Sequence, residues 1–247
     1  MITEYHRPST IEEALQLLAR QQPTRPLGGG TVLSAPAAEA VAVVDLQKLG
    51  LGEIAAQGQT LHIGATATLE SLLHTAGIQE ALAAALRHEA SYNLRQAATV
   101  AGSLVAAGGR SPFGLAMLAL DALLHLQPND EELAYGELLA LGAKSLRGKL
   151  ITKVTLSLQA TLSYEYVART PADLPIFALA LARWPSGRTR LAVGGWGAAP
   201  IFVLDGRDSS GLAEGLANAL SSAGDQWASA EYRLEAGKAL LSRMGDK

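Results

Sequence analysis

The segment RPLGGGTVLSAP, residues 25–36, places three consecutive glycines directly after a short extended run. Glycine lacks a Cβ atom, so it reaches positive φ angles and lets another group touch the main chain. Because glycine also destabilises regular elements, three together indicate a turn, a hinge or a ligand cradle. This segment therefore limits how the N-terminal part of the chain can fold.

Two phosphate-binding patterns are excluded at these glycines. Only Thr31 to Ala40 separate them from the next predicted strand, VAVVDL over 41–46, and Pro36 lies among those residues. A parallel βαβ crossover needs about a dozen residues or more, and a dinucleotide fingerprint opens such a crossover with G-x-G-x-x-G. A P-loop is excluded because no G-K-[ST] follows. Taken alone, the glycines favour a turn without a ligand.

Apolar periodicity predicts an α+β chain. The stretch RPSTIEEALQLLARQ predicts a helix capped by Ser9, with Glu12 completing a capping box. With strands around 24–27 and 41–46, it forms a βαβ-like N-terminal piece. Residues 59–73 predict a strand that runs into a helix starting near Thr66 or Thr68, and 113–126 begin as a helix and end as a strand, whereas 95–109 are ambiguous. A strand is predicted over 148–158 and three extended runs follow after 160, with helices around 78–90, 211–222 and 227–244. Residues 185–187, Pro-Ser-Gly, predict a hairpin turn. We expect three parts, 1–53, 54–158 and 159–247.

Composition narrows the function. The net charge is −3 and no cluster of Lys and Arg stands out, which argues against a nucleic-acid surface. The chain has no cysteine, so it carries no disulfide, thiolate zinc site or iron–sulfur cluster of its own. No apolar stretch reaches the roughly 20 residues of a membrane span, and MITEYHRPST does not read as a signal peptide. We expect a cytoplasmic protein.

A second segment of small residues, ATVAGSLVAAGGRSP over 98–112, offers the hydroxyl groups of Thr99 and Ser103. Free N–H groups in such a loop can form an anion nest, and two such loops suit the two charged groups of a pyrophosphate. No catalytic residues or metal ligands are predicted, because the five histidines are dispersed and neither H-E-x-x-H nor G-x-S-x-G occurs.

Seven segments, in order along nearly the whole chain, resemble the FAD-binding medium subunit of molybdenum hydroxylases, the family of xanthine and carbon monoxide dehydrogenases. Two are similar to its FAD loops: PLGGGTVL to "aGGtdl", and RQAATVAGSLVAAGGRSPFGLAMLALDA to "iRn.aTiGGNia.aspagD..p.LlaLdA". The other five are YHRPSTIEEALQLL, HIGATATLESL, RTPADLPIFALAL, LAVGGWGAAPI and WASAEYRLEAGKALLSR.

The resemblance implies a PCMH-type FAD-binding fold, in which the N-terminal βαβ piece and the following α/β piece form the FAD site. A C-terminal three-stranded antiparallel sheet with helices would follow. The cofactor would be FAD, with the flavin ring toward 148–158. The residues implied as FAD contacts are Leu27, Gly28, Gly29, Gly30, Thr31, Val32, Thr99, Val100, Ala101, Gly102, Ser103, Pro112 and Ile151.

The function implied is that of an oxidoreductase subunit. It would pass electrons from [2Fe–2S] clusters of a partner through FAD to an acceptor such as NAD or a quinone. The implied partners are a molybdopterin-binding large subunit and a small [2Fe–2S] subunit, assembled as a dimer of heterotrimers. Since this chain has no cysteine, its electrons must come from such a partner.

Four positions depart from the family pattern and leave an alternative open. Val32 replaces a polar residue, Ala101 a glycine and Ser103 an asparagine, while Pro112 replaces an aspartate that binds the ribose in the family. The alternative is a flavin-free scaffold subunit with a degenerate site. If FAD is bound, we expect Gly29→Val to lower FAD occupancy by collision with the cofactor, with little change in the melting temperature measured without FAD. We also expect Pro112→Asp to tighten FAD binding.

Overall fold

The computed structural model describes residues 1–33, 40–207 and 209–245, and these form two compact units. Unit 1 comprises residues 1–75, 91–106 and 123–156, and unit 2 comprises 76–90, 107–122 and the chain from 157 onward. The α+β fold predicted from the sequence is confirmed. The finer division into three parts stays a prediction. No helix among the described residues is long and apolar enough to cross a membrane.

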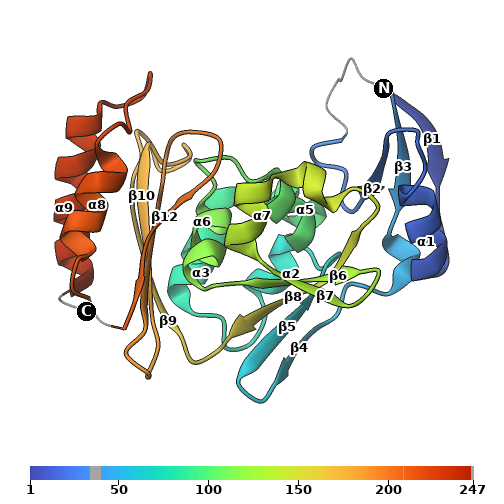
Figure 1. Cartoon of the computed structure of the whole chain (residues 1–247), viewed down its shortest axis with the longest axis horizontal. Helices are drawn as coiled ribbons and strands as arrows, with labels where there is room; N and C mark the ends of the chain where they lie inside the picture. The colour runs from blue at the N-terminus through green and yellow to red at the C-terminus, as the bar shows by residue number, and fades with distance from the viewer. Residues whose placement is uncertain (34–39, 208, 246–247) are drawn as a thin grey trace. The chain divides into compact units, whose positions relative to one another are not determined.

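The N-terminal part of unit 1 is the predicted βαβ piece (Figure 1). Strands β1 (Ile2–His6) and β2 (Thr24–Leu27) both pair in parallel with β3 (Val41–Asp45), so β2 is an edge strand. Helix α1 (Ile11–Leu18) packs its apolar face on this sheet. Its N-cap is Thr10 and not Ser9: Thr10 stays extended and accepts a hydrogen bond from the Glu13 amide. The Glu13 carboxylate in turn accepts from the amide of Ser9 and not of Thr10, so these two hydrogen bonds replace the predicted capping box of Ser9 and Glu12.

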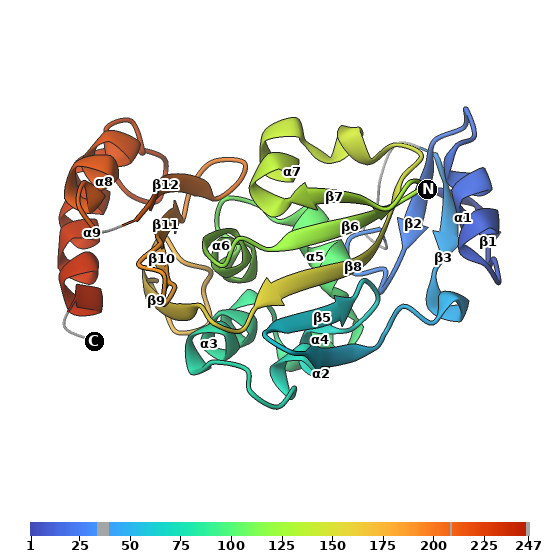
Figure 2. The same ribbon diagram turned by 60° about the horizontal axis from the view of Figure 1, so that its bottom comes forward.

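The rest of unit 1 is a five-stranded sheet in the order β4-β5-β8-β6-β7, seen in Figure 2. Its strands are β4 (Ile54–Gln57), β5 (Thr60–Gly64), β6 (Leu123–Gln127), β7 (Glu131–Ala134) and β8 (Leu150–Ser157). The helices of this part are α2 (Leu69–Leu73), α4 (Tyr92–Ala97), α5 (Val100–Ala106) and α7 (Tyr135–Leu141), with 3₁₀ turns η1 (Gln47–Leu49) and η2 (Ala143–Leu146).

Unit 2 is an antiparallel sheet in the order β12-β11-β10-β9, with helices on both faces. The strands are β9 (Thr161–Val167), β10 (Phe177–Arg183), β11 (Thr189–Gly194) and β12 (Ile201–Gly206). Helices α8 (Leu212–Leu220) and α9 (Ala230–Gly245) cover one face, and α3 (Glu80–Glu89) and α6 (Pro112–Ala119) contact the other.

The sheet of unit 2 has four strands, and the prediction of three was wrong on this point. The run TRLAVGGWGAAPIFVL is two strands, because Gly195 and Gly197 adopt positive φ angles of 118° and 70° and turn the chain between β11 and β12. The hairpin turn predicted at 185–187 is confirmed. It joins β10 to β11, with Gly187 at a φ of 86°.

Arg233 of α9 is fully buried in unit 2. A buried charge is tolerated only when it is paired and hydrogen-bonded, and this guanidinium has five acceptors. It donates to the Asp225 carboxylate and to the backbone oxygens of Ile176, Gly195, Ala223 and Ala228. The single side chain thereby ties α9 to the loops before β10, after β11 and after α8.

Candidate functional site

The glycine loop after β2 packs directly on the segment that joins α4 to α5. A Cβ atom on Gly28 would lie 2.6 Å from Thr99 Oγ1, and one on Gly29 would overlap the backbone carbonyl of Ala97. Gly30 has open space but adopts a left-handed φ of 70°. Two of the three glycines are therefore required by contact between protein segments, and the third by backbone conformation. The expectation that a side chain at Gly29 would leave the cofactor-free fold unperturbed is wrong.

The second predicted loop is the start of a helix. The sequence left 95–109 ambiguous, and the structure forms α5 from Val100. The four amides from Val100 to Ser103 are all used within the protein: they donate to Ala67 O, Ala65 O, Thr99 Oγ1 and Thr99 O respectively. The prediction of free N–H groups was therefore wrong for residues 100–103. Helical bonding and the strand-end residues at 65–67 take those donors.

A buried ion pair holds the segment between α4 and α5 in place. Arg95 of α4 donates from Nε to Glu70 Oε2 of α2 at 2.7 Å, and both side chains are buried. The Leu69 amide of α2 donates to Ala98 O. These contacts fix residues 97–99, which are the surface that the glycine loop covers.

By contrast, two amides of the glycine loop have no acceptor. Among the described residues, no hydrogen bond is formed by the backbone N–H of Gly29 or of Thr31. Both residues line a pocket of about 900 Å³ that lies within unit 1. The loop thus presents free backbone donors to a cavity large enough for a nucleotide cofactor.

The pocket collects most of the residues that the sequence singled out. Those in its lining are Gly28, Gly29, Gly30, Thr31, Val32, Thr99, Ala101, Gly102 and Ile151. Leu27, Val100 and Ser103 are outside the lining that the described residues form. Leu27 is the last residue of β2, and Val100 and Ser103 belong to α5, so all three support the wall instead of facing the cavity.

The lining is positively charged, which the sequence analysis missed. It includes Arg20, Arg25, Lys144, Arg147 and Lys149, and no Asp or Glu among the described residues. Within this lining Arg20 pairs with Glu4 and Lys149 pairs with Glu131. The segment AKSLRGK, 143–149, carries three cations and no acid, and this local excess was the available signal within a chain of net charge −3.

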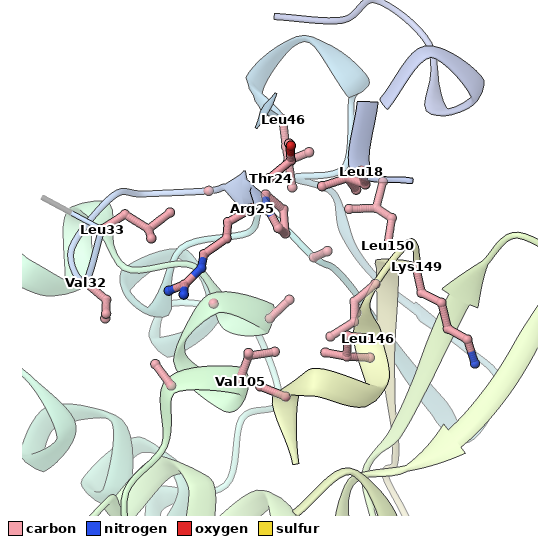
Figure 3. Close-up of a pocket in the computed structure, with 18 of the residues that line it drawn as sticks. Leu18, Thr24, Arg25, Val32, Leu33, Leu46, Val105, Leu146, Lys149 and Leu150 are labelled. Atoms are coloured by element: carbon pink, nitrogen blue, oxygen red, sulfur yellow. The ribbon is translucent and has the colours of Figure 1, made fainter. Parts of the chain in front are cut away.

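Figure 3 separates the cation that enters the pocket from one that does not. The Arg25 side chain extends from β2 into the cavity, on the side that Val32, Leu33 and Val105 line, whereas Lys149 points away from it. With free amides at one wall and net positive charge, the cavity suits an anionic ligand, and apolar side chains such as Leu18, Leu46 and Leu146 complete it. Among known cofactors a dinucleotide with a diphosphate has this chemistry.

The pattern of residues 1–156 matches the family model described as the FAD binding domain in molybdopterin dehydrogenase. The chain belongs to this family. Its members are parts of oxidoreductases, and the predicted family and the cofactor FAD are thereby confirmed. The pocket fits an FAD-binding domain of this family, because residues of the glycine loop whose N–H groups have no acceptor among the described residues lie beside a cationic lining.

The chain resembles curated proteins and solved structures over half to nearly all of its length. It is 28% identical over 240 residues to the uncharacterized protein YgfM of Escherichia coli strain K12, covering 94% of this chain and 91% of that protein. It is 28% identical over 131 residues to the nicotine 6-hydroxylase medium subunit of Paenarthrobacter nicotinovorans, covering 50% and 46%. A chain of CO dehydrogenase from Oligotropha carboxidovorans shares the fold, with a TM-score of 0.78, 24% identity, and 97% and 95% of the chains covered.

One predicted FAD contact, Pro112, is not among the residues that line the pocket and belongs to unit 2. Pro112 is the first residue of α6 and is buried. A carboxylate is nevertheless present at this helix start, because Glu89 of α3 accepts hydrogen bonds from Ser111 Oγ at 2.7 Å and from the Phe113 amide at 2.9 Å. Pro112→Asp would bury a second carboxylate beside Glu89. The structure therefore argues against the expectation that this substitution simply tightens FAD binding.

Glu89 gives a testable pH dependence. Burial raises the pKa of its carboxyl above the ordinary 4.5, outweighing the hydrogen bonds from Phe113 and Ser111. Between these two pKa values the folded state binds more protons than the unfolded state, so the free energy of unfolding falls as pH rises. Glu89→Gln keeps an acceptor oxygen and removes the buried charge. We expect urea unfolding to show the variant gaining stability relative to wild type as the pH rises above the ordinary carboxyl pKa of 4.5. A difference that shrinks or stays constant would contradict this.

Proposed function

We propose that the chain is the FAD-carrying medium subunit of a molybdenum hydroxylase, and that its pocket in unit 1 holds the dinucleotide. The observation that carries the proposal is the glycine loop, which offers the free amides of Gly29 and Thr31 to a cationic cavity. FAD, when bound, supplies the two-electron chemistry that connects one-electron clusters to a soluble acceptor. The protein supplies binding, orientation and charge.

The predicted contacts divide into two roles in this proposal. The N–H groups of Gly29 and Thr31 meet the diphosphate, while Thr99, Ala101 and Gly102 form the wall against which the loop closes. Ile151 and Val32 add apolar surface to the cavity. Leu27, Val100 and Ser103 hold the walls in position, and Pro112, at the start of α6 in unit 2, is kept as a candidate contact.

The partners follow from what the chain lacks. Without cysteine it cannot bind an iron–sulfur cluster through thiolates, so the electrons are delivered by a small [2Fe–2S] subunit. A molybdopterin-binding large subunit completes the complex, and we propose a dimer of heterotrimers in the cytoplasm. The acceptor is NAD or a quinone. A relative that is 28% identical over half of this chain is named the medium subunit of nicotine 6-hydroxylase, which supports the proposal that this chain is one subunit of a larger enzyme.

A flavin-free scaffold is the second candidate, and Pro112 favours it because a proline cannot replace a carboxylate toward the ribose. The two candidates differ in one direct measurement. We expect the purified full chain to show a flavin absorption spectrum, or to acquire one on addition of FAD, with stoichiometric FAD released on denaturation. A colourless protein that does not bind added FAD would refute the flavoprotein proposal and support the flavin-free scaffold.

A further inference from the structure

The diphosphate of FAD needs more positive potential than the glycine loop supplies. Within the part of the chain that the structure describes, the amides of Gly29 and Thr31 form no hydrogen bond, and both residues line the pocket. The start of α5, on which this loop packs, adds no donor from Val100 to Ser103, since those four amides already have acceptors in the protein. The further donors that a diphosphate requires must therefore come from side chains.

Four of the five cations of the lining, namely Arg20, Arg25, Arg147 and Lys149, differ in what they contact or where they point. Arg20 is engaged by Glu4 at 3.0 Å, and Lys149 pairs with Glu131 and points away from the cavity. Arg147 donates to a backbone oxygen, that of Gln21. Arg25 differs from these, because its side chain extends from the edge strand β2 into the cavity, only two residues before the glycine loop begins.

We propose that Arg25 is the phosphate-binding side chain of the pocket and selects diphosphate-containing ligands over riboflavin. A guanidinium carries five N–H donors in a planar fork that matches two phosphate oxygens. The Arg25 guanidinium can therefore donate to an acceptor in the protein and to a phosphate at the same time. Short, rigid β2 fixes the position of its Cα, and the loop amides approach the same anion from the adjacent residues.

The inference rests on the proposed function, and binding experiments on the FAD-free full chain separate the two. The probes are FAD, ADP and riboflavin, titrated by calorimetry at low and high salt into wild type, Arg25→Gln, Arg25→Lys and Lys149→Gln. Lys149→Gln is the matched control, because it removes one positive charge from the same lining without removing a side chain that enters the cavity.

We expect Arg25→Gln to weaken FAD and ADP about 10- to 100-fold, the range for losing a charge-assisted hydrogen bond. Riboflavin binding should be unchanged, and the salt dependence of FAD binding should flatten. Arg25→Lys should recover part of the affinity because it keeps the charge but not the fork. Melting temperatures without FAD should match wild type, since Arg25 is exposed.

Two results would overturn the assignment of Arg25. One is an FAD affinity of Arg25→Gln equal to that of wild type. The other is an equal loss of FAD affinity in Arg25→Gln and Lys149→Gln, which would mean that only the total positive charge of the lining matters. If wild type itself fails to bind FAD and ADP, both this inference and the proposed function fall. FAD binding with no role for Arg25 leaves the proposed function intact.

Discussion

Gly29→Ala is expected to destabilise unit 1 even when no flavin is present. The new Cβ atom would overlap the backbone carbonyl of Ala97, and backbone cannot rotate away as a flexible side chain can. The loop or the residues between α4 and α5 must move, although Ala97 to Thr99 are held by the buried pair of Arg95 and Glu70. Overpacking of this kind costs about 3 kcal/mol or more. Urea unfolding of the FAD-free protein measures the loss.

A glycine of the same unit provides the control. Gly52 has no positive φ, and its nearest neighbour to an added Cβ is Thr66 Oγ1 at 3.7 Å, an ordinary contact. Gly52→Ala should therefore unfold like wild type. If Gly29→Ala had wild-type stability but impaired FAD binding, the cofactor and not the contact with Ala97 would require a glycine at this position. That result would refute the packing explanation.

Arg233→Met is expected to have the largest effect in unit 2. The substitution keeps the volume and apolar stem of the side chain but leaves the Asp225 carboxylate and four backbone oxygens without their donor. Each buried acceptor left unsatisfied costs about 1–3 kcal/mol, and the hydrogen bonds to Ile176, Ala223 and Gly195 are all buried. We expect insoluble protein or a loss of at least about 4 kcal/mol in denaturant unfolding.

The comparison variant for Arg233 lies on the same helix. Lys238 is exposed on α9 and pairs only with Glu235, three residues earlier. Lys238→Met removes the same charge and should change the free energy of unfolding by less than about 1 kcal/mol. If Arg233→Met were as mild as Lys238→Met, the loops around α9 would have to be held by other contacts, and the role given to Arg233 would be incorrect.

Several elements were predictable because local signals and tertiary structure agree. The apolar face of α1, the β-branched run of β3 and the turn at 185–187 each carry a short-range pattern, and the structure follows all three. Strand order within the five-stranded sheet was not predictable, since β8 inserts between β5 and β6 by pairing residues distant along the chain. The start of α5 was ambiguous because its small residues have no apolar period of their own.

At the site, too, features with a local sequence signal were predictable, and features that depend on contacts between distant segments were not. The glycine loop was found from its composition, but the reason for its glycines, contact with Ala97 and Thr99, depends on about 70 residues of intervening chain. The cationic lining was missed because Arg20, Arg25 and the segment 143–149 are far apart in sequence and converge only in the fold. Pro112 was read as the loss of a carboxylate, whereas Glu89 brings one to the same helix start.

Hydrogen exchange of the full chain with and without FAD tests most directly whether the glycine-loop pocket holds the cofactor. The amides of Gly29 and Thr31 have no acceptor among residues 1–33, 40–207 and 209–245, so a peptide covering residues 27–33 should exchange rapidly alone and slow markedly when FAD is added. A peptide from α8, residues 212–220, should exchange equally in both states. Retained, stoichiometric FAD with unchanged exchange at 27–33 would contradict the site assigned to unit 1.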